Sequence, residues 1–218
     1  WSLLPERSLP HASLRALALP FSCGIARKGA LDEPALQVDL EHVSRWGFVS
    51  GAAEVSEIGS DKLRFGDADL LTTKLRPYLG KTILNEFDGA IGTTEWIPLR
   101  VDRERLRPKL LFHLMQTRRY TALASLFMSG KEHPRISPDM LLRFRVPLLE
   151  ITAQDSLVAE MDAMNATARA LESQVGSPQR VVSLAFEDRF GFSLSELAAE
   201  QEKTVTSLRL VDCAGNRD

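Results

Sequence analysis

A run of apolar residues in the last third of the chain repeats with the spacing of a coiled coil, and this repeat restricts the fold more than any other feature. Gaps of 4, 3, 4, 3 and 4 residues separate Leu157, Met161, Met164, Ala168, Leu171 and Val175. Because such gaps place all these side chains on one stripe of an α-helix, the sequence predicts a long helix over residues 152–175 that packs against another helix. The run Gly176-Ser177-Pro178 is expected to end it.

The chain before this helix has two different patterns. In residues 35–100, short apolar runs alternate with glycines, which is typical of strands joined by turns. We expect strands at 36–38, 48–49, 68–71, 82–84 and 96–99. After Pro108 the apolar spacing becomes helical and predicts one helix over 108–127. Ser137 is then expected to cap a short helix that starts at Pro138 and ends near Phe144, and a strand is expected at 145–148.

These patterns divide the chain into three segments. Residues 1–150 are expected to form a β-rich α+β globular domain with packed helices, 151–176 a helical spacer, and 177–218 a segment without an assigned role. Within the last segment a helix is expected over 193–204 and a polar tail from Asp212. The sequence begins at Trp1 and not at a methionine, so we expect its numbering to start inside a longer polypeptide.

Charge is distributed unevenly along the chain. The formal net charge is −2, but residues 70–145 contain 14 lysines and arginines against 7 aspartates and glutamates. A basic middle segment between acidic flanks suits a surface that faces DNA phosphates. An ordinary solvated surface is the alternative.

Motifs of common catalytic and metal sites are absent from the sequence. The four histidines show no HxH or HExxH spacing, and there is no GxSxG elbow, phosphate-binding GxxxxGK[ST] loop or Asn-Pro-Pro-aromatic tetrapeptide. We therefore expect no catalytic residue, no metal and no cofactor. Cys23 and Cys213 are far apart, which favours a reducing cytoplasm over a disulfide-linked fold, and no apolar run is long enough to predict a membrane span.

Two segments contain candidate DNA-binding residues. In residues 69–81, an extended chain would place Lys74, Arg76 and Tyr78 on one face, with Lys81 nearby; alternatively, Tyr78 packs the domain and the charges are solvated. The second segment is the glycine-led loop 130–135, which carries Lys131, His133 and Arg135. The alternative interpretation of this segment is an ordinary solvated loop.

A third group of candidates lies in residues 93–95. Thr93 and Thr94 offer hydroxyls to phosphate, whereas a buried carboxylate that ties strands together is the preferred interpretation of Glu95. The basic run over 100–109 is interpreted as a solvated connection.

Several of these motifs follow one another in an order known from one protein family. The series begins with Asp69-Leu70-Leu71-Thr72-Thr73-Lys74-Leu75-Arg76-Pro77-Tyr78-Leu79-Gly80-Lys81 and continues with Gly89-Ala90-Ile91-Gly92-Thr93-Thr94-Glu95-Trp96. It then contains Met128-Ser129-Gly130, Pro134-Arg135-Ile136-Ser137, Val146-Pro147-Leu148 and Gln154. Over residues 35–175 this series resembles the specificity subunits of type I restriction-modification systems. Departures are the Gly66-Asp67 pair, displaced by two residues, and an incomplete Pro-Leu-Pro-Pro-Leu run before the long helix.

The resemblance implies a target-recognition domain that binds double-stranded DNA, reads one half-site and has no catalytic centre of its own. Methyl transfer from S-adenosylmethionine and any ATP-driven cleavage would then belong to modification and restriction subunits in the cytoplasm, as a host defence. The long helix would pair with its counterpart in a second recognition domain or in a homodimer. Members of the family contain two recognition domains, whereas this chain has room for one. The resemblance therefore implies a half-subunit, a fragment, or a single recognition domain fused to something upstream of Trp1.

Two other functions stay open at this stage. The chain could be the C-terminal recognition domain of a single-chain restriction enzyme or methyltransferase, or an interaction protein of the same fold that does not bind DNA.

Overall fold

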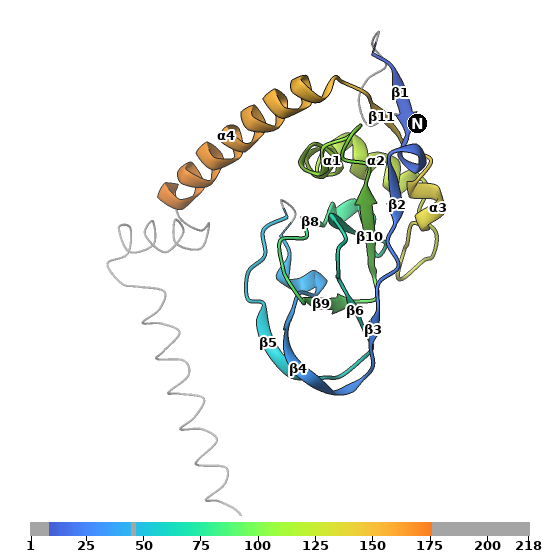
Figure 1. Cartoon of the computed structure of the whole chain (residues 1–218), viewed down its shortest axis with the longest axis vertical. Helices are drawn as coiled ribbons and strands as arrows, with labels where there is room; N and C mark the ends of the chain where they lie inside the picture. Colours follow the sequence, from blue (N-terminus) through green and yellow to red (C-terminus); the bar gives the residue numbers. More distant parts are fainter. Residues whose placement is uncertain (1–8, 45–46, 176–218) are drawn as a thin grey trace, which may run out of the picture. The chain divides into compact units, whose positions relative to one another are not determined.

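The computed structural model describes residues 9–44 and 47–175, without the side chains of 168, 169 and 171–175 (Figure 1). The chain divides into two compact units, Trp1–Met161 and Asp162–Asp218. The helix expected over 193–204, the polar tail and the expected helix end at Gly176-Ser177-Pro178 lie outside the described residues. Among the described helices, none combines the length and the apolar character needed to cross a membrane.

Three sheets form the first unit. A two-stranded sheet pairs β1 (His11–Ser13) with β11 (Arg145–Pro147). A four-stranded antiparallel sheet has the order β2 (Ala18–Pro20), β10 (Trp96–Val101), β7 (Leu70–Thr73) and β8 (Thr82–Leu84). A five-stranded sheet has the order β3 (Ile25–Ala26), β6 (Lys62–Arg64), β9 (Ile91–Thr93), β4 (Gly29–Gln37) and β5 (Ala53–Ile58), with β9 and β4 parallel.

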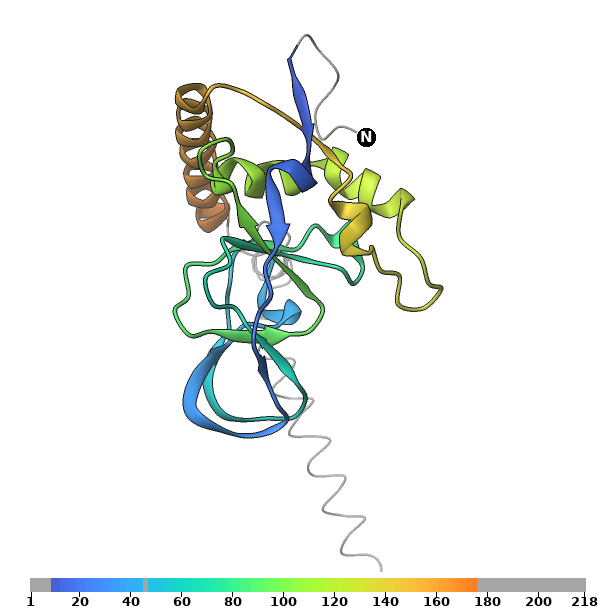
Figure 2. The same ribbon diagram turned by 45° about the vertical axis from the view of Figure 1, so that its right-hand side comes forward.

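Helices and single 3-10 turns complete the architecture. The α-helices are α1 (Pro108–Met115), α2 (Arg118–Leu126), α3 (Pro138–Leu141) and α4 (Ile151–Val175). The 3-10 turns are η1 (Leu14–Ala16), η2 (Leu40–His42) and η3 (Pro77–Leu79). Figure 2 shows the segment that connects α2 with α3 as a long loop at the side of the domain. The mixture of sheets and packed helices is the α+β class expected from the sequence.

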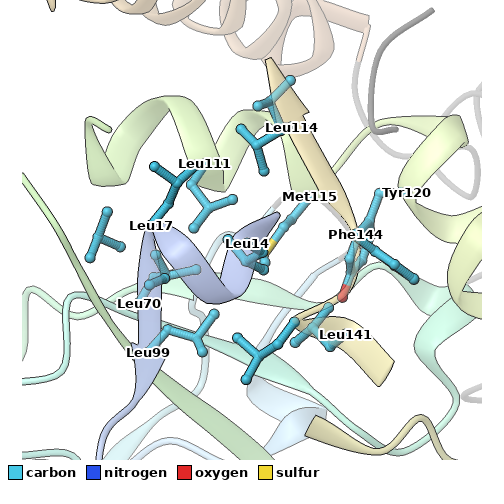
Figure 3. Packing of buried hydrophobic residues seen from close by; sticks show 14 of the residues in the cluster. Leu14, Leu17, Leu70, Leu99, Leu111, Leu114, Met115, Tyr120, Leu141 and Phe144 are labelled. Carbon is cyan, nitrogen blue, oxygen red and sulfur yellow. The ribbon is translucent and has the colours of Figure 1, made fainter. Parts of the chain in front are cut away.

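Strand β7 is buried on both of its faces and separates two hydrophobic cores. Leu70 belongs to a cluster with Leu99 of β10, η1, α1, α2 and α3 (Figure 3). Leu71, the next residue, belongs to a second cluster with Phe65 and Trp96. Successive residues of a strand point to opposite faces, so this one strand supplies side chains to both cores.

One predicted helix is two helices in the structure. The prediction of a single helix over 108–127 is wrong because Thr117 has extended dihedral angles (φ −67°, ψ 151°) and caps α2, its side chain accepting a hydrogen bond from the backbone N–H of Tyr120. A threonine satisfies a free N–H group at a helix start better than it continues a helix. The new start directs Tyr120 into the core, where its hydroxyl lies 2.9 Å from Oγ1 of Thr72.

Other predicted elements agree with the structure to different degrees. Residues 82–84 are a strand, and Ser137 caps a helix that starts at Pro138, although this helix ends at Leu141 and not near Phe144. Residues 48–49 form only an isolated bridge, between Val43 and Val49. Strands β1, β2, β3, β5 and β6 had no predicted counterpart. They are short or, as in β5, mostly exposed, so they lack the alternation of buried and exposed residues that marks a strand in sequence.

Candidate nucleic-acid interface

The two basic segments singled out in the sequence lie side by side in the structure. The backbone N–H of Arg76 donates to the carbonyl of Pro134 (2.7 Å), and the N–H of Ile136 donates to the carbonyl of Lys74 (2.9 Å). The N–H of Lys74 in turn donates to the carbonyl of Glu95, in the turn between β9 and β10 (3.0 Å). Three segments that are far apart in sequence therefore form one surface, which we call the basic face and define as residues 74–79, 93–95 and 129–136.

An arginine of the long loop is tied to the carboxylate of Glu95. Nε and Nη2 of Arg135 donate to Glu95 at 3.0 Å and 2.8 Å. This hydrogen-bonded ion pair lowers the pKa of Glu95, with smaller contributions from the nearby charges of Lys74 and His133. It also raises the pKa of Arg135. The sequence interpretation of Glu95 as a buried carboxylate that ties strands together is therefore correct only for its tying role: the side chain is 21% exposed and it joins a loop to the β9–β10 turn.

The segment around Arg76 is a turn and not an extended strand. Arg76 has left-handed dihedral angles (φ 47°, ψ 57°), η3 follows at once, and Gly80 is left-handed again. The expectation that Lys74, Arg76 and Tyr78 share one face of a strand is therefore wrong. The physical reason is Pro77, which is buried and occupies the first position of η3, where its fixed φ suits a helical turn.

The remaining predicted residues have different surroundings. Nζ of Lys81 donates to the carbonyl of Leu40, so this cation is engaged within the protein. Thr93 is half-buried and its hydroxyl accepts from the N–H of Glu95 (3.3 Å), whereas Thr94 is exposed. Thr93 also borders a small cavity of about 230 Å³ beside the ion pair of Lys62 and Asp39. None of these contacts was indicated by the sequence spacing.

Within the described part of the chain, two cations of the basic face have no side-chain partner. Arg76 and Lys131 are exposed and form no hydrogen bond or ion pair through their side chains. His133, also exposed, contributes its carbonyl oxygen to Arg135 Nη1 (3.2 Å). The arginines of the basic run over 100–109 are all engaged: Arg100 with Asp67, Arg103 with Asp69, Arg105 with the carbonyl of Ala16, and Arg107 with Asp155. Among the described residues, Lys28, Arg64, Arg118 and Arg143 are also exposed without a side-chain hydrogen bond or ion pair, but they lie outside the basic face.

A second polar cluster attaches the start of α4 to the domain. The fully buried amide of Gln154 accepts from the N–H of Arg107 (2.9 Å) and donates to the carbonyls of Arg105 and Leu149 (2.8 Å each). The side chain of Arg107 also forms two hydrogen bonds to Asp155 (2.7 and 2.8 Å). Gln154 is a structural anchor that the sequence indicated only as a motif residue.

The apolar stripe of α4 begins against the domain. Leu157 and Met161 are half-buried and pack against the first core, together with Val158. Met164, in the second unit, is exposed. The side chains of Ala168, Leu171 and Val175 are outside the described residues. The pairing of this stripe with a second helix stays a prediction.

Cys23 is a free cysteine, and potential metal ligands are dispersed over the described residues. Across 9–44 and 47–175, no three His, Cys, Asp or Glu side chains are placed to hold a metal ion. Burial raises the pKa of the Cys23 thiol to about 11, so this thiol is protonated at neutral pH.

Comparison with known proteins gives matches in sequence and in structure, although no family model matches the chain. The specificity subunit of the type I restriction enzyme EcoDI from Escherichia coli is 29% identical over 154 residues, which are 69% of this chain and 34% of that protein. The crystal structure of the HsdS subunit from Thermoanaerobacter tengcongensis superposes with a TM-score of 0.60 at 23% identity, covering 85% of this chain and 49% of that one. A chain from a structure of a type I restriction-modification system superposes with a TM-score of 0.61 at 22% identity, covering 84% and 48%. The chain thus spans about a third of the curated relative and half of the solved chains.

Proposed function

We propose that this chain, a homologue of the specificity subunits of type I restriction-modification systems, binds double-stranded DNA through its basic face and recognises one half-site. The observation that carries this proposal is the pair of unpartnered, exposed cations Arg76 and Lys131 on a face built from the motifs shared with that family. The match covers about half of a solved HsdS subunit, which supports a single recognition domain.

The ion pairs of the basic face indicate which of its cations are structural and which are proposed to contact DNA. Arg135 is neutralised by Glu95, so its main role is to hold the long loop in place. Arg76 and Lys131 are free to displace counterions from phosphates, which is the main source of affinity in protein–DNA binding. Arg76 is in addition able to donate two hydrogen bonds to a guanine in the major groove.

The proposed activity is binding alone. Methyl transfer from S-adenosylmethionine and DNA cleavage are assigned to modification and restriction subunits that this chain would direct to their site. We also propose that the stripe of α4 pairs with the corresponding helix of a second recognition domain or a second copy of the chain. Gln154 and Asp155 would then set the direction in which α4 leaves the domain and so the spacing of two half-sites.

A selection experiment tests the DNA-binding proposal. The full 218-residue chain is incubated with a library of randomised duplexes at about physiological salt, and bound DNA is recovered and sequenced. Arg76→Ala and Lys131→Ala are compared with Arg100→Ala, a matched control whose arginine is engaged by Asp67. Each of the first two substitutions is expected to lower affinity and to reduce the slope of log K against log salt by about one, whereas the control is expected to leave both unchanged.

The outcomes of this selection distinguish recognition by the basic face from other modes of DNA binding and from the absence of recognition. Enrichment of a short motif by the wild type, weakened by the two test substitutions, supports recognition by the basic face. Equal losses in all three variants would show a general effect of net charge and not a contact by the basic face, and no loss in either test variant would place binding elsewhere on the surface. If no sequence is enriched, even with a modification subunit added, the chain is not a DNA-recognition domain.

The helix-pairing proposal has a separate test. Light scattering on the full chain at micromolar concentration is expected to give the mass of a dimer, and a monomer would overturn pairing between two copies. Leu171→Asp, in the predicted stripe, is expected to shift the mass toward a monomer because a buried carboxylate is costly.

A further inference from the structure

We propose that Tyr78 and Leu79 form an apolar wedge that enters a base-pair step of the bound duplex, so that the chain selects for a deformable step in addition to any base edges it contacts. This inference rests on the proposed function, because it concerns how the same basic face binds DNA. It adds a second source of sequence preference, namely the ease with which a step is unstacked.

Tyr78 and Leu79 are two consecutive large apolar residues on the basic face that remain exposed. Their exposed fractions are 42% and 39%, whereas the preceding residue, Pro77, is buried. A single exposed apolar side chain is ordinary on a protein surface. An adjacent pair at the end of a turn, next to a free arginine, is less common and matches the apolar wedges with which several proteins open base steps.

The turn that carries the pair is held rigidly. Arg76 is the one non-glycine residue with a positive φ in the described part of the chain, a conformation that is retained only where the surroundings enforce it. Here the N–H of Arg76 is bound by Pro134, and the N–H groups of Leu79 and Gly80 close the turn on the carbonyls of Arg76 and Pro77. A wedge must be rigid, because a flexible turn would fold away from the stacked bases.

The other side of the turn is fixed as well. A side chain at Gly80 would lie 3.1 Å from the Thr121 methyl group of α2, so η3 packs closely on that helix. Both ends of the turn that carries Tyr78 and Leu79 are therefore held by contacts within the domain.

The charges around the wedge favour DNA over a protein partner. Arg76 immediately precedes the pair, and Lys74 lies close enough to Glu95 to lower its pKa. In such an arrangement the cation can contact a phosphate while the neighbouring apolar side chains contact the stacked bases. Two side chains alone are also far too small for a stable protein interface, which buries about 800 Å² on each partner.

The expected preference is for pyrimidine–purine steps, because TA and CA/TG steps are unstacked most easily. It is tested by repeating the selection from randomised duplexes with Leu79→Ala and Tyr78→Ala. Leu19→Ala, which shortens another exposed leucine, on β2, is the matched control. The wild type and Leu19→Ala are expected to enrich a pyrimidine–purine step at one fixed position. The two wedge variants are expected to lose the enrichment at that position and to keep it at the others.

Binding and fluorescence measurements add an independent readout. On the duplex selected by the wild type, with 2-aminopurine at the enriched step, fluorescence is expected to rise on binding because the base is unstacked. Leu79→Ala is expected to abolish this rise and to weaken binding roughly fivefold to a hundredfold, with an unchanged salt slope because no cation is removed. Thermal unfolding of each variant checks that the fold is retained.

The failure of this inference is distinguishable from failure of the proposed function. If the wild type and the wedge variants enrich the same motif at every position and give the same fluorescence, the wedge is overturned while DNA recognition stands. If the wild type enriches no sequence, both are overturned. A loss of binding to a modification subunit, with DNA binding intact, would assign the pair to a protein contact and would also overturn the wedge.

Discussion

Arg135 and Glu95 are 40 residues apart in sequence, and their side chains form an ion pair in which Nε and Nη2 of Arg135 both donate hydrogen bonds to the carboxylate. This pair joins the long loop to the β9–β10 turn. The same loop is hydrogen-bonded through its backbone to residues 74–76. The ion pair therefore holds the surface on which Arg76 and Lys131 are presented, while it neutralises one of the cations nearest to them.

The Arg135–Glu95 pair predicts a particular dependence of stability on pH. The folded protein lowers the pKa of Glu95 below its ordinary 4.5, so the pair contributes stability above about pH 4.5, and this contribution is lost as pH falls through the lower folded pKa. We expect the wild type to be more stable than Glu95→Gln by up to about 1 kcal/mol at pH 7, with the difference disappearing in acid. Urea unfolding of both proteins between neutral and acidic pH measures it. A difference that persists in acid would show that the carboxylate charge is not the cause.

The left-handed conformation of Arg76 predicts that glycine and alanine at this position differ in stability but not in DNA binding. Arg76→Gly and Arg76→Ala both remove the guanidinium, but only glycine adopts a φ of 47° without a steric penalty. We therefore expect the glycine variant to be more stable than the alanine variant by about 1 kcal/mol, while both bind DNA equally weakly. Chemical denaturation and duplex titration on the two variants test this. Equal stabilities would mean that the turn relaxes when the arginine is removed.

Gly92 on β9 is predicted to be irreplaceable for steric reasons. A Cβ atom there would lie 2.3 Å from the carbonyl oxygen of Val38 and 2.7 Å from the ring of Phe65. We expect Gly92→Ala to lower the free energy of unfolding by about 3 kcal/mol. At Gly59 an added Cβ would meet no atom within 4 Å, so Gly59→Ala is the control and should change stability by less than about 0.5 kcal/mol. Similar effects at the two positions would contradict this packing argument.

Gln154 is predicted to be the main polar anchor of α4. Gln154→Ala leaves the N–H of Arg107 and the carbonyls of Arg105 and Leu149 without their amide partner. Buried groups that lose a partner cost about 1–3 kcal/mol, so we expect a loss of about 3 kcal/mol in urea unfolding. Glu160→Ala, at an exposed position of the same helix, serves as the control and should have little effect. A small effect at Gln154 would mean that the apolar contacts of Leu157 and Met161 suffice to attach the helix.

The sequence alone determined the features that depend on local spacing. The 3.6-residue period of an α-helix identified α4 from its apolar stripe, the Ser137-Pro138 pair located the start of α3, and a short apolar run located β8. The motif series around Lys74, Arg76 and Arg135 predicted the similarity to specificity subunits that the comparisons found, and it contains most residues of the basic face. These results follow because neighbours in sequence are sufficient to define a helix cap, a period or a motif.

Tertiary structure decided everything that depends on partners distant in sequence. Pro77 and the hydrogen bond from Arg76 to Pro134 convert an expected strand into a rigid turn, and Thr117 divides an expected helix at the point where Tyr120 packs against Thr72 in the core. Whether a cation is free or engaged was likewise decided by contacts across the fold: Lys81 is bound to the carbonyl of Leu40 and Arg135 to Glu95, whereas Arg76 and Lys131 remain available. Residue type sets which charges a chain carries, but only the packing of distant segments determines which of them a ligand meets.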